Sequence, residues 1–148
     1  MRAYSIEHPG VSLTAAATTI IELTAAAAKC CIILRAWLSQ QGNTSSNQQG
    51  IALARQSTAG TGVTAPTANP ADGSDTAFGG TVRGLCTTQG TLGAVLFPDS
   101  FNWQNPWTYL GVPEERETVG GGGILALRTQ TTPQALTVNS GLKLLEVG

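Results

Sequence analysis

The stretch LTAAATTIIELTAAAAKCCIILRAWL, residues 13–38, decides the fold class of this chain. Alanine is the best helix former, so propensity alone favours one long helix here. The stretch is nevertheless laced with β-branched Thr and Ile, and no polar face recurs at the 3.6-residue period. Residues 30–38 are bulky and apolar apart from Arg35, as in a strand covered on both faces. The stretch therefore predicts two strands, residues 18–24 and 30–39, joined through the alanine run, with Trp37 in the core.

Short strand candidates separated by turn signals continue along the rest of the chain. They cover residues 50–55, 81–88, 91–97, 107–110, 115–119, 124–129, 135–138 and 142–147. A turn cluster fills residues 40–47. Residues 58–80, rich in Thr, Ala, Gly and Pro, predict a long loop of the kind that serves as a binding loop or an arm.

This spacing predicts one all-β domain over residues 1–148, with eight to ten short strands. The expected architecture is a jelly-roll-like antiparallel β-sandwich of about eight strands. An N-terminal arm, residues 1–10, and the long loop, residues 58–80, complete the prediction.

The composition restricts the possible partners. Charged residues make up 11% of the 148 residues and the net charge is -1, whereas an ordinary soluble domain has about 25% charged residues. A polar but uncharged surface suits permanent association, and a simple composition bias is the alternative. Without a basic excess we expect no direct nucleic-acid partner. Glu22, Lys29 and Arg35 interrupt the longest apolar region, so we expect no membrane span, and residues 1–8 hold no apolar signal core.

The three cysteines, Cys30, Cys31 and Cys86, show no Cys-x-x-Cys spacing, so neither a zinc site nor a redox motif is predicted. Free thiols formed in a reducing cytoplasm are the default expectation. The sequence leaves open a bridge from Cys86 to either of the other two.

The sequence predicts no catalytic, metal or cofactor site. The single histidine, His8, has no nucleophile or carboxylate beside it in the sequence. The acidic cluster at residues 114–117 is expected to be solvated or to pair with a neighbouring subunit. Residues 72–75 fit an Asp-Gly turn better than a calcium loop. Residues 120–123 fit a tight turn or a close backbone approach better than a phosphate loop, since a strand follows them.

The best candidate for a partner interface lies between residues 101 and 116. Trp and Tyr dominate interface hot spots, and loop-like residues surround the aromatic side chains here. The alternative is that the same aromatic residues fill the core. The candidate interface residues are Phe101, Trp103, Trp107, Tyr109, Glu115 and Arg116.

The layout resembles a family of small virion proteins from tailed bacteriophages, the jelly-roll capsid decoration or cement proteins. The likeness covers most of the chain as a diffuse pattern. It rests on residues 11–14, 18–23, 32–38, 54–61, 101–105, 113–116, the glycine run 120–123, residues 125–128 and the final Val/Leu-rich strand. The alanine run at 25–28 and the Cys30-Cys31 pair are not features of that family.

The resemblance implies a non-enzymatic protein on the capsid exterior of a virion, made in the bacterial cytoplasm. Its partner would be the major capsid protein, whose subunits it would bridge and stabilise as a homo-oligomer, with a trimer favoured. No cofactor is implied. The alternative function is a tail, neck or head-fibre component that binds a host receptor or glycan, because jelly rolls and exposed aromatic rings suit sugar binding.

Overall fold

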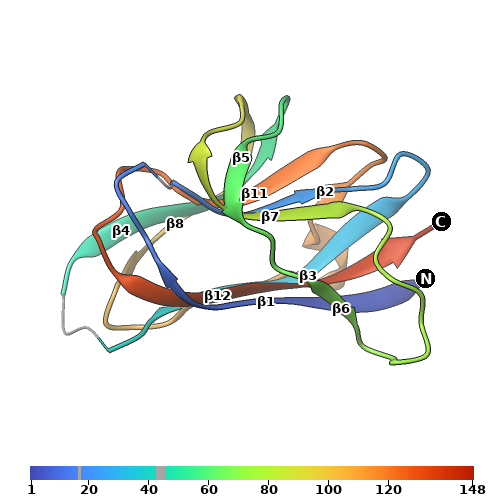
Figure 1. Ribbon diagram of the computed structural model, residues 1–148, viewed down its shortest axis with the longest axis horizontal. Helices are drawn as coiled ribbons and strands as arrows, with labels where there is room; N and C mark the ends of the chain where they lie inside the picture. The colour runs from blue at the N-terminus through green and yellow to red at the C-terminus, as the bar shows by residue number, and fades with distance from the viewer. Residues whose placement is uncertain (17, 43–45) are drawn as a thin grey trace.

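The chain folds into two antiparallel β-sheets that pack face to face, as the computed structural model in Figure 1 shows. The structure describes residues 1–16, 18–42 and 46–148. Ala17 of the alanine-rich stretch and residues 43–45 of the predicted turn lie outside those ranges. Within them the elements are β1 (Arg2–Ser12), β2 (Thr19–Thr24), β3 (Cys30–Gln40), β4 (Gln48–Gln56), β5 (Thr61–Thr64), β6 (Ala68–Pro70), β7 (Thr81–Thr88), β8 (Leu92–Asn102), β9 (Trp107–Leu110), the 3₁₀ helix η1 (Pro113–Glu115), β10 (Thr118–Val119), β11 (Ile124–Thr129) and β12 (Thr137–Val147). In these ranges no helix has the length and apolar character needed to span a membrane.

The strand order is that of a jelly roll. Sheet A runs β10–β3–β12–β1–β6, with β9 also paired to β3, and sheet B runs β5–β7–β2–β11–β4–β8. The chain folds back on itself in nested antiparallel pairs: β1 with β12, β2 with β11, β3 with β9 and β10, and β4 with β8. Successive pairs alternate between the two sheets, so one long hairpin is rolled into a sandwich. The predicted all-β, jelly-roll-like sandwich is confirmed.

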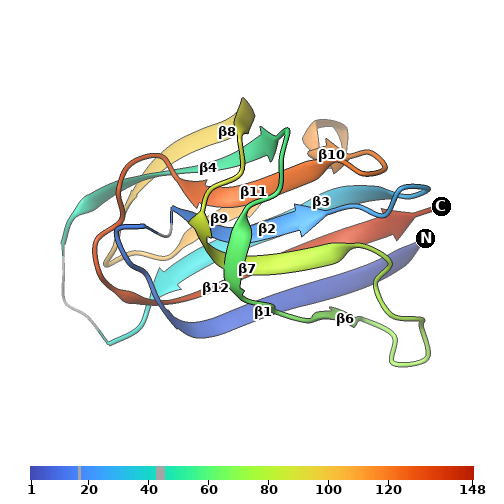
Figure 2. The same ribbon diagram turned by 45° about the horizontal axis from the view of Figure 1, so that its top comes forward.

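The segment between β4 and β8, residues 57–91, is an insertion that extends both sheets at one edge. β7 pairs with β2 and β5 pairs with β7, which adds two strands to sheet B. β6 pairs with β1 and adds a short strand to sheet A. Figure 2 shows β7 beside β2 and β6 beside β1. Residues 58–80 were expected to form a loop, but they contain β5 and β6.

The N-terminal residues are part of a sheet, which corrects the expected arm over residues 1–10. β1 lies between β12 and β6 in sheet A. The reason is its alternation: Tyr4, Ile6 and His8 are buried, whereas Glu7 and Pro9 are exposed. Period-two burial of this kind is typical of a strand that covers a core with one face.

Several strand boundaries differ from those predicted. The bounds 81–88, 107–110 and 124–129 are confirmed, but residues 135–138 and 142–147 belong to the single strand β12. β8 continues through Pro98 to Asn102 because it is the edge strand of sheet B, where a missing N–H need not break a ladder. Residues 115–119 form the end of η1 and only a two-residue strand, β10.

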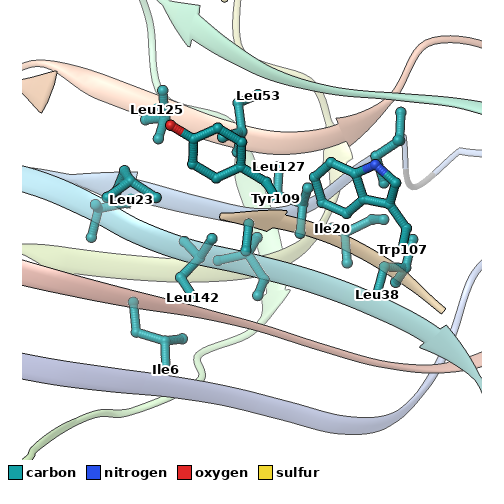
Figure 3. Close-up of a cluster of buried hydrophobic side chains, with 14 of the residues drawn as sticks. Ile6, Ile20, Leu23, Leu38, Leu53, Trp107, Tyr109, Leu125, Leu127 and Leu142 are labelled. Carbon is teal, nitrogen blue, oxygen red and sulfur yellow. The ribbon is translucent and has the colours of Figure 1, made fainter. Parts of the chain in front are cut away.

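The core lies between the two sheets, where large apolar side chains from both meet (Figure 3). Sheet A contributes Ile6, Leu38 and Leu142, and sheet B contributes Ile20, Leu23, Leu53, Leu125 and Leu127. Trp37 was expected in this core but lies outside it and is half-buried. Its neighbours Ala36 and Leu38 face the core, so Trp37 must point to the opposite side of β3.

Candidate binding surfaces

The aromatic residues of the predicted interface fill the core. Phe101, Trp103, Trp107 and Tyr109 are only 1–8% exposed. The Phe101 and Trp103 rings pack edge to face with centroids 4.8 Å apart, and Trp107 Nε1 donates a hydrogen bond to Asp99 Oδ2 at 2.8 Å. Figure 3 shows Trp107 and Tyr109 among the aliphatic core side chains. The core alternative therefore holds for all four rings, which cannot anchor a partner while the chain stays folded.

Glu115 and Arg116, the other two predicted interface residues, lie in a turn at the edge of sheet A. Glu115 is exposed together with Glu114, and Arg116 is half-buried, with Nε donating to the backbone oxygen of Gly111 at 3.2 Å. The Tyr109 hydroxyl holds this turn by donating to the Glu115 backbone oxygen at 3.3 Å. We call residues 110–117 the acidic turn. Leu110 is 73% exposed at its start, so the turn presents carboxylates next to an apolar side chain.

The outer face of sheet A, the side away from the core, carries apolar and basic side chains. Register places Ile32 beside Leu145, Arg35 beside Lys143 and Trp37 beside Gly141 on the neighbouring strands β3 and β12. These side chains alternate with core residues such as Ile33 and Leu144, so they point outward. Figure 1 shows sheet A at the bottom of the sandwich, and no described segment forms a further layer beneath it.

Trp37 occupies a fixed place on this face. A β-carbon at Gly141 would collide with Trp37 Cζ2 and would lie 2.6 Å from the backbone oxygen of Ile6. Only glycine therefore fits under the indole. The guanidinium carbon of Arg35 lies 5.2 Å from the indole centroid, within cation–π distance. The pair places a rigid aromatic ring and a cation side by side on the outer face.

A groove lies on the outer face of sheet B, on the opposite side of the molecule. It has a volume of about 210 Å³ and is lined by Ala52, Leu92, Val95, Arg128 and Gln130. The small side chain of Ala52 is the buried residue of this lining, whereas Leu92 and Val95 on the edge strand are exposed. Arg128 forms no ion pair among the described residues. We call this feature the sheet B groove; it combines apolar walls with one unpaired cation.

Two buried carboxylates attach the insertion to the sandwich. Glu22 on β2 is fully buried; its Oε1 lies 3.0 Å from Arg83 Nη1, and its Oε2 accepts a hydrogen bond from the Gly60 N–H at 2.8 Å. Glu146 on β12 pairs with Lys29 at 2.8 Å and accepts from the Gly79 N–H at 3.0 Å. Each carboxylate thus binds one cation and one backbone N–H. Glu22 holds the start of the predicted loop at Gly60, and Glu146 holds its end at Gly79. Buried charges are tolerated because they are paired and hydrogen-bonded in this way.

His8 contacts the insertion from β1. Its Nε2 and Thr64 Oγ1 share a hydrogen bond at 2.8 Å, and its Nδ1 is buried without a partner among the described residues. Gly84 lies against the ring, where a β-carbon would be 2.5 Å from His8 Cε1. Burial lowers the pKa of His8 below the ordinary 6.5. The ring is therefore a neutral packing element between sheet A and β5.

The other weak motifs have structural roles. Asp72 Oδ1 accepts hydrogen bonds from the Ser74 N–H at 2.9 Å and the Ser74 hydroxyl at 2.8 Å, so residues 72–75 form the expected turn. Gly121 lies so close to the Ala27 backbone oxygen that a β-carbon would collide with it, which confirms a close backbone approach in the glycine run. No group of three or more His, Cys, Asp or Glu residues with metal-binding geometry occurs in the described ranges.

All three cysteines are free, which resolves the open question of a bridge from Cys86. Burial raises the pKa of the Cys31 thiol to about 12, with a further contribution from the nearby Glu146 carboxylate. Burial, assisted by Glu22, raises the pKa of the Cys86 thiol to about 11. Thiols with such pKa values hold their protons at neutral pH and are poor nucleophiles.

Comparison with known proteins adds no further constraint. No protein-family model matches the chain, and no match was found among the curated proteins or the solved structures.

Proposed function

We propose that this chain is a non-enzymatic structural protein of a bacteriophage particle, which decorates the capsid exterior and stabilises it by bridging subunits of the major capsid protein. The jelly-roll order of the strands and the 11% content of charged residues are both in keeping with this function.

The observation that carries the proposal is a pair of opposed, uncovered surfaces. A bridging protein contacts at least two neighbours, so it needs two separate surfaces. The outer face of sheet A offers Ile32, Trp37 and Leu145, and the sheet B groove offers Leu92 and Val95. Apolar side chains on opposite faces of a small sandwich suit a molecule that sits between other proteins.

The mechanism of such a protein is mechanical. Each copy buries surface against neighbouring subunits, and many copies on one lattice gain avidity even when each contact is weak. Exposed polar but uncharged side chains lower the desolvation cost of those contacts compared with charged ones. The shell then expands or ruptures only when many such contacts break together.

Antibody labelling of virus particles tests this proposal. Particles purified from a lysate in which the chain is produced are treated with gold-coupled antibody against the chain and imaged. We expect gold distributed evenly over the heads. Gold confined to the tail or neck, or no gold on any particle, contradicts capsid decoration. Adding purified chain to particles that lack it should also raise the temperature of DNA release, and Val95→Glu in the groove should reduce this effect.

A second candidate function is glycan binding by a tail, neck or head-fibre component. The observation that favours it is Trp37, a half-buried indole fixed beside Arg35 on a flat sheet, since exposed aromatic rings stack on sugars. A glycan array probed with the purified chain and with Trp37→Ala tests it. Binding that disappears in the variant supports this function, and silence of the wild-type chain at high concentration rules it out.

A further inference from the structure

The central strands of sheet A, β3 and β12, carry apolar side chains on both faces, and the outer face also carries Arg35 and Lys143. Inward residues of β3 and β12, such as Ile33 and Leu144, are fully buried, and outward Ile32 and Leu145 are apolar as well. An antiparallel sheet with one face in water normally alternates apolar and polar residues. The outward Ile32, Trp37 and Leu145 break that alternation; they are half-buried within the chain and supply apolar surface that a partner would bury.

The most distinctive side chains of this face lie near its middle. Trp37 and Arg35 are on β3, next to β12, which is the third of the five successive strands of sheet A. Trp and Arg are the residues most enriched in interface hot spots, which gather near the centre of an interface. The indole is already held in place by Gly141, so little side-chain freedom is lost when a partner binds.

The size of the face matches a specific interface. β1, β3 and β12 have 11 residues each, so at about 3.3 Å per residue each strand is about 36 Å long, and three strands spaced about 4.8 Å apart cover about 500 Å². The flanking strands β6, β9 and β10 widen the face. The total approaches the roughly 800 Å² per partner of a standard protein interface.

The charges on the face are complementary to each other. Arg35 and Lys143 lie on β3 and β12, and Glu7 lies on β1, with Glu7 next to Gly141 and Ser5 next to Lys143 in register. None of these three forms an ion pair within the described part of the chain. When β1 of one copy lies across β12 or β3 of a second copy, opposite charges meet twice, as two-fold symmetry requires.

We propose that the outer face of sheet A binds the same face of a second copy of this chain, forming a two-fold symmetric dimer. The interface is centred on Trp37 and Arg35, with Lys143 facing Glu7 of the second copy. The resemblance to decoration proteins favours a trimer, but a self-complementary face closes at two copies. This inference deepens the proposed function and rests on it for the role of the dimer: the neighbour on the sheet A face is then a second copy, and the two sheet B grooves of the dimer bridge two capsid subunits.

Sedimentation equilibrium of the purified chain tests the dimer without any particle. We expect the mass of two copies over about 1–100 µM, the range in which weak specific interfaces are populated. Trp37→Ser should shift the population to single copies at concentrations where the wild-type chain is dimeric. Val95→Glu, an equally disruptive change on the opposite face, should leave the dimer intact. A single-copy or three-copy mass for the wild-type chain overturns the two-fold dimer.

Charge reversal identifies the face even if Trp37→Ser unfolds the chain. Lys143 and Glu7 are both exposed, so neither change should disturb folding. Lys143→Glu alone and Glu7→Lys alone should each weaken the dimer at least tenfold, and the double variant should recover most of the loss. Dimers unaffected by either single change would place the interface elsewhere. Because these measurements use the free chain, their failure would leave the particle-labelling result standing.

Discussion

At the level of single residues, the two buried glutamates show that a chain poor in charged residues places some of them inside. Glu22 and Glu146 sit on opposite sheets, yet each binds a cation and the N–H of a glycine in the insertion. Glycine allows the backbone to approach the carboxylate closely. Neither role is visible in the sequence, because the partners are 38 and 67 positions away along the chain.

We predict that Glu22→Ala lowers the free energy of unfolding by about 1–3 kcal/mol, because it leaves the Gly60 N–H without its buried acceptor and Arg83, which is 31% exposed, without its ion pair. Urea unfolding followed by tryptophan fluorescence measures the change. Glu114→Ala is the matched control, since Glu114 is exposed and its loss should change stability little. A stability loss equal in the two variants would show that Glu22 does not hold the insertion.

The stability of the chain should fall on acidification through the titration of His8. Because the pKa of His8 in the folded chain lies below 6.5, the unfolded chain takes up the proton first as the pH falls. The stabilisation by neutral His8 is therefore complete above about pH 6.5 and is lost by up to about 1.4 kcal/mol per pH unit below it.

Urea unfolding at a series of pH values between about 5 and 7.5 checks this dependence, since carboxylates titrate mostly below that window. The chain has a single histidine, so His8→Gln should remove most of the slope. A wild-type chain whose stability is level across the window, or a variant that keeps the same slope, contradicts the assignment to His8.

Tryptophan illustrates what sequence can and cannot decide about the binding surfaces. Trp107 and Tyr109 alternate with the exposed Thr108 and Leu110, so the period-two pattern of β9 contains the signal for their burial. For Trp37, apolar neighbours on both sides conceal the pattern, and the burial of Ala36 and Leu38 in the structure is what shows that the ring lies outside. The predicted core position of Trp37 was wrong, whereas for Trp107 and Tyr109 the core alternative left open by the sequence holds.

At the level of elements, the insertion is a built part of the sandwich. β6 pairs with β1, the Tyr4 hydroxyl donates to the Thr76 backbone oxygen at 2.9 Å, and Arg2 pairs with Asp75 at 3.4 Å. Composition alone suggested an arm, because Thr, Ala, Gly and Pro are common in flexible segments. Short strands at sheet edges carry too few residues to show a period, so β5 and β6 escaped prediction.

We predict that replacing residues 64–74 by a short Gly-Ser linker lowers the Tm by roughly 5–15 °C, because β6 and the Thr64–His8 contact are lost, and each kcal/mol shifts the Tm of a chain this size by about 2–4 °C. Differential scanning calorimetry measures the shift. Inserting two glycines after Gly73, whose surroundings are open, is the control and should leave the Tm unchanged. An unchanged Tm in the deletion variant would restore the view that this segment is a free arm.

The long strands were predictable and their ends were less so. The stretch 13–38 forms β2 and β3 rather than a helix, because β-branched and bulky apolar residues outweigh alanine propensity once both faces can pack. Residues 139–141 were left between two predicted strands, yet they lie inside β12, with Gly141 under Trp37. Tertiary contacts, and not local turn chemistry, explain that glycine.

At the level of the whole molecule, the nested pairing brings the first and last strands together. Arg2 pairs in register with Glu146, and Figure 1 shows the N- and C-termini side by side at the same end of sheet A. Strand β12 lies between β3 and β1, so sheet A cannot form before the end of the chain is present. Such long-range pairing is slow to assemble, and folding in milliseconds to seconds is typical of it.

We predict that a circular permutant, joined from Gly148 to Met1 by a short linker and opened between Asp72 and Gly73, folds with a Tm within a few degrees of the natural order, because the joined ends are neighbours and the new ends lie in an exposed turn. Circular dichroism and calorimetry check this. A permutant opened at Gly141, in the middle of β12, should fail to fold. Equal behaviour of the two permutants would contradict a central role for β12.

The neighbouring termini also determine how the molecule resists force. Hydrogen bonds between antiparallel strands run perpendicular to the strands. Tension applied at the two ends would therefore load the β1–β12 ladder one bond at a time, like a zipper opened from its end. A load spread across the broad faces of the sheets would instead be shared by many contacts at once. This fold therefore resists tension applied at its two termini poorly, and resists a load applied across the faces of its sheets well.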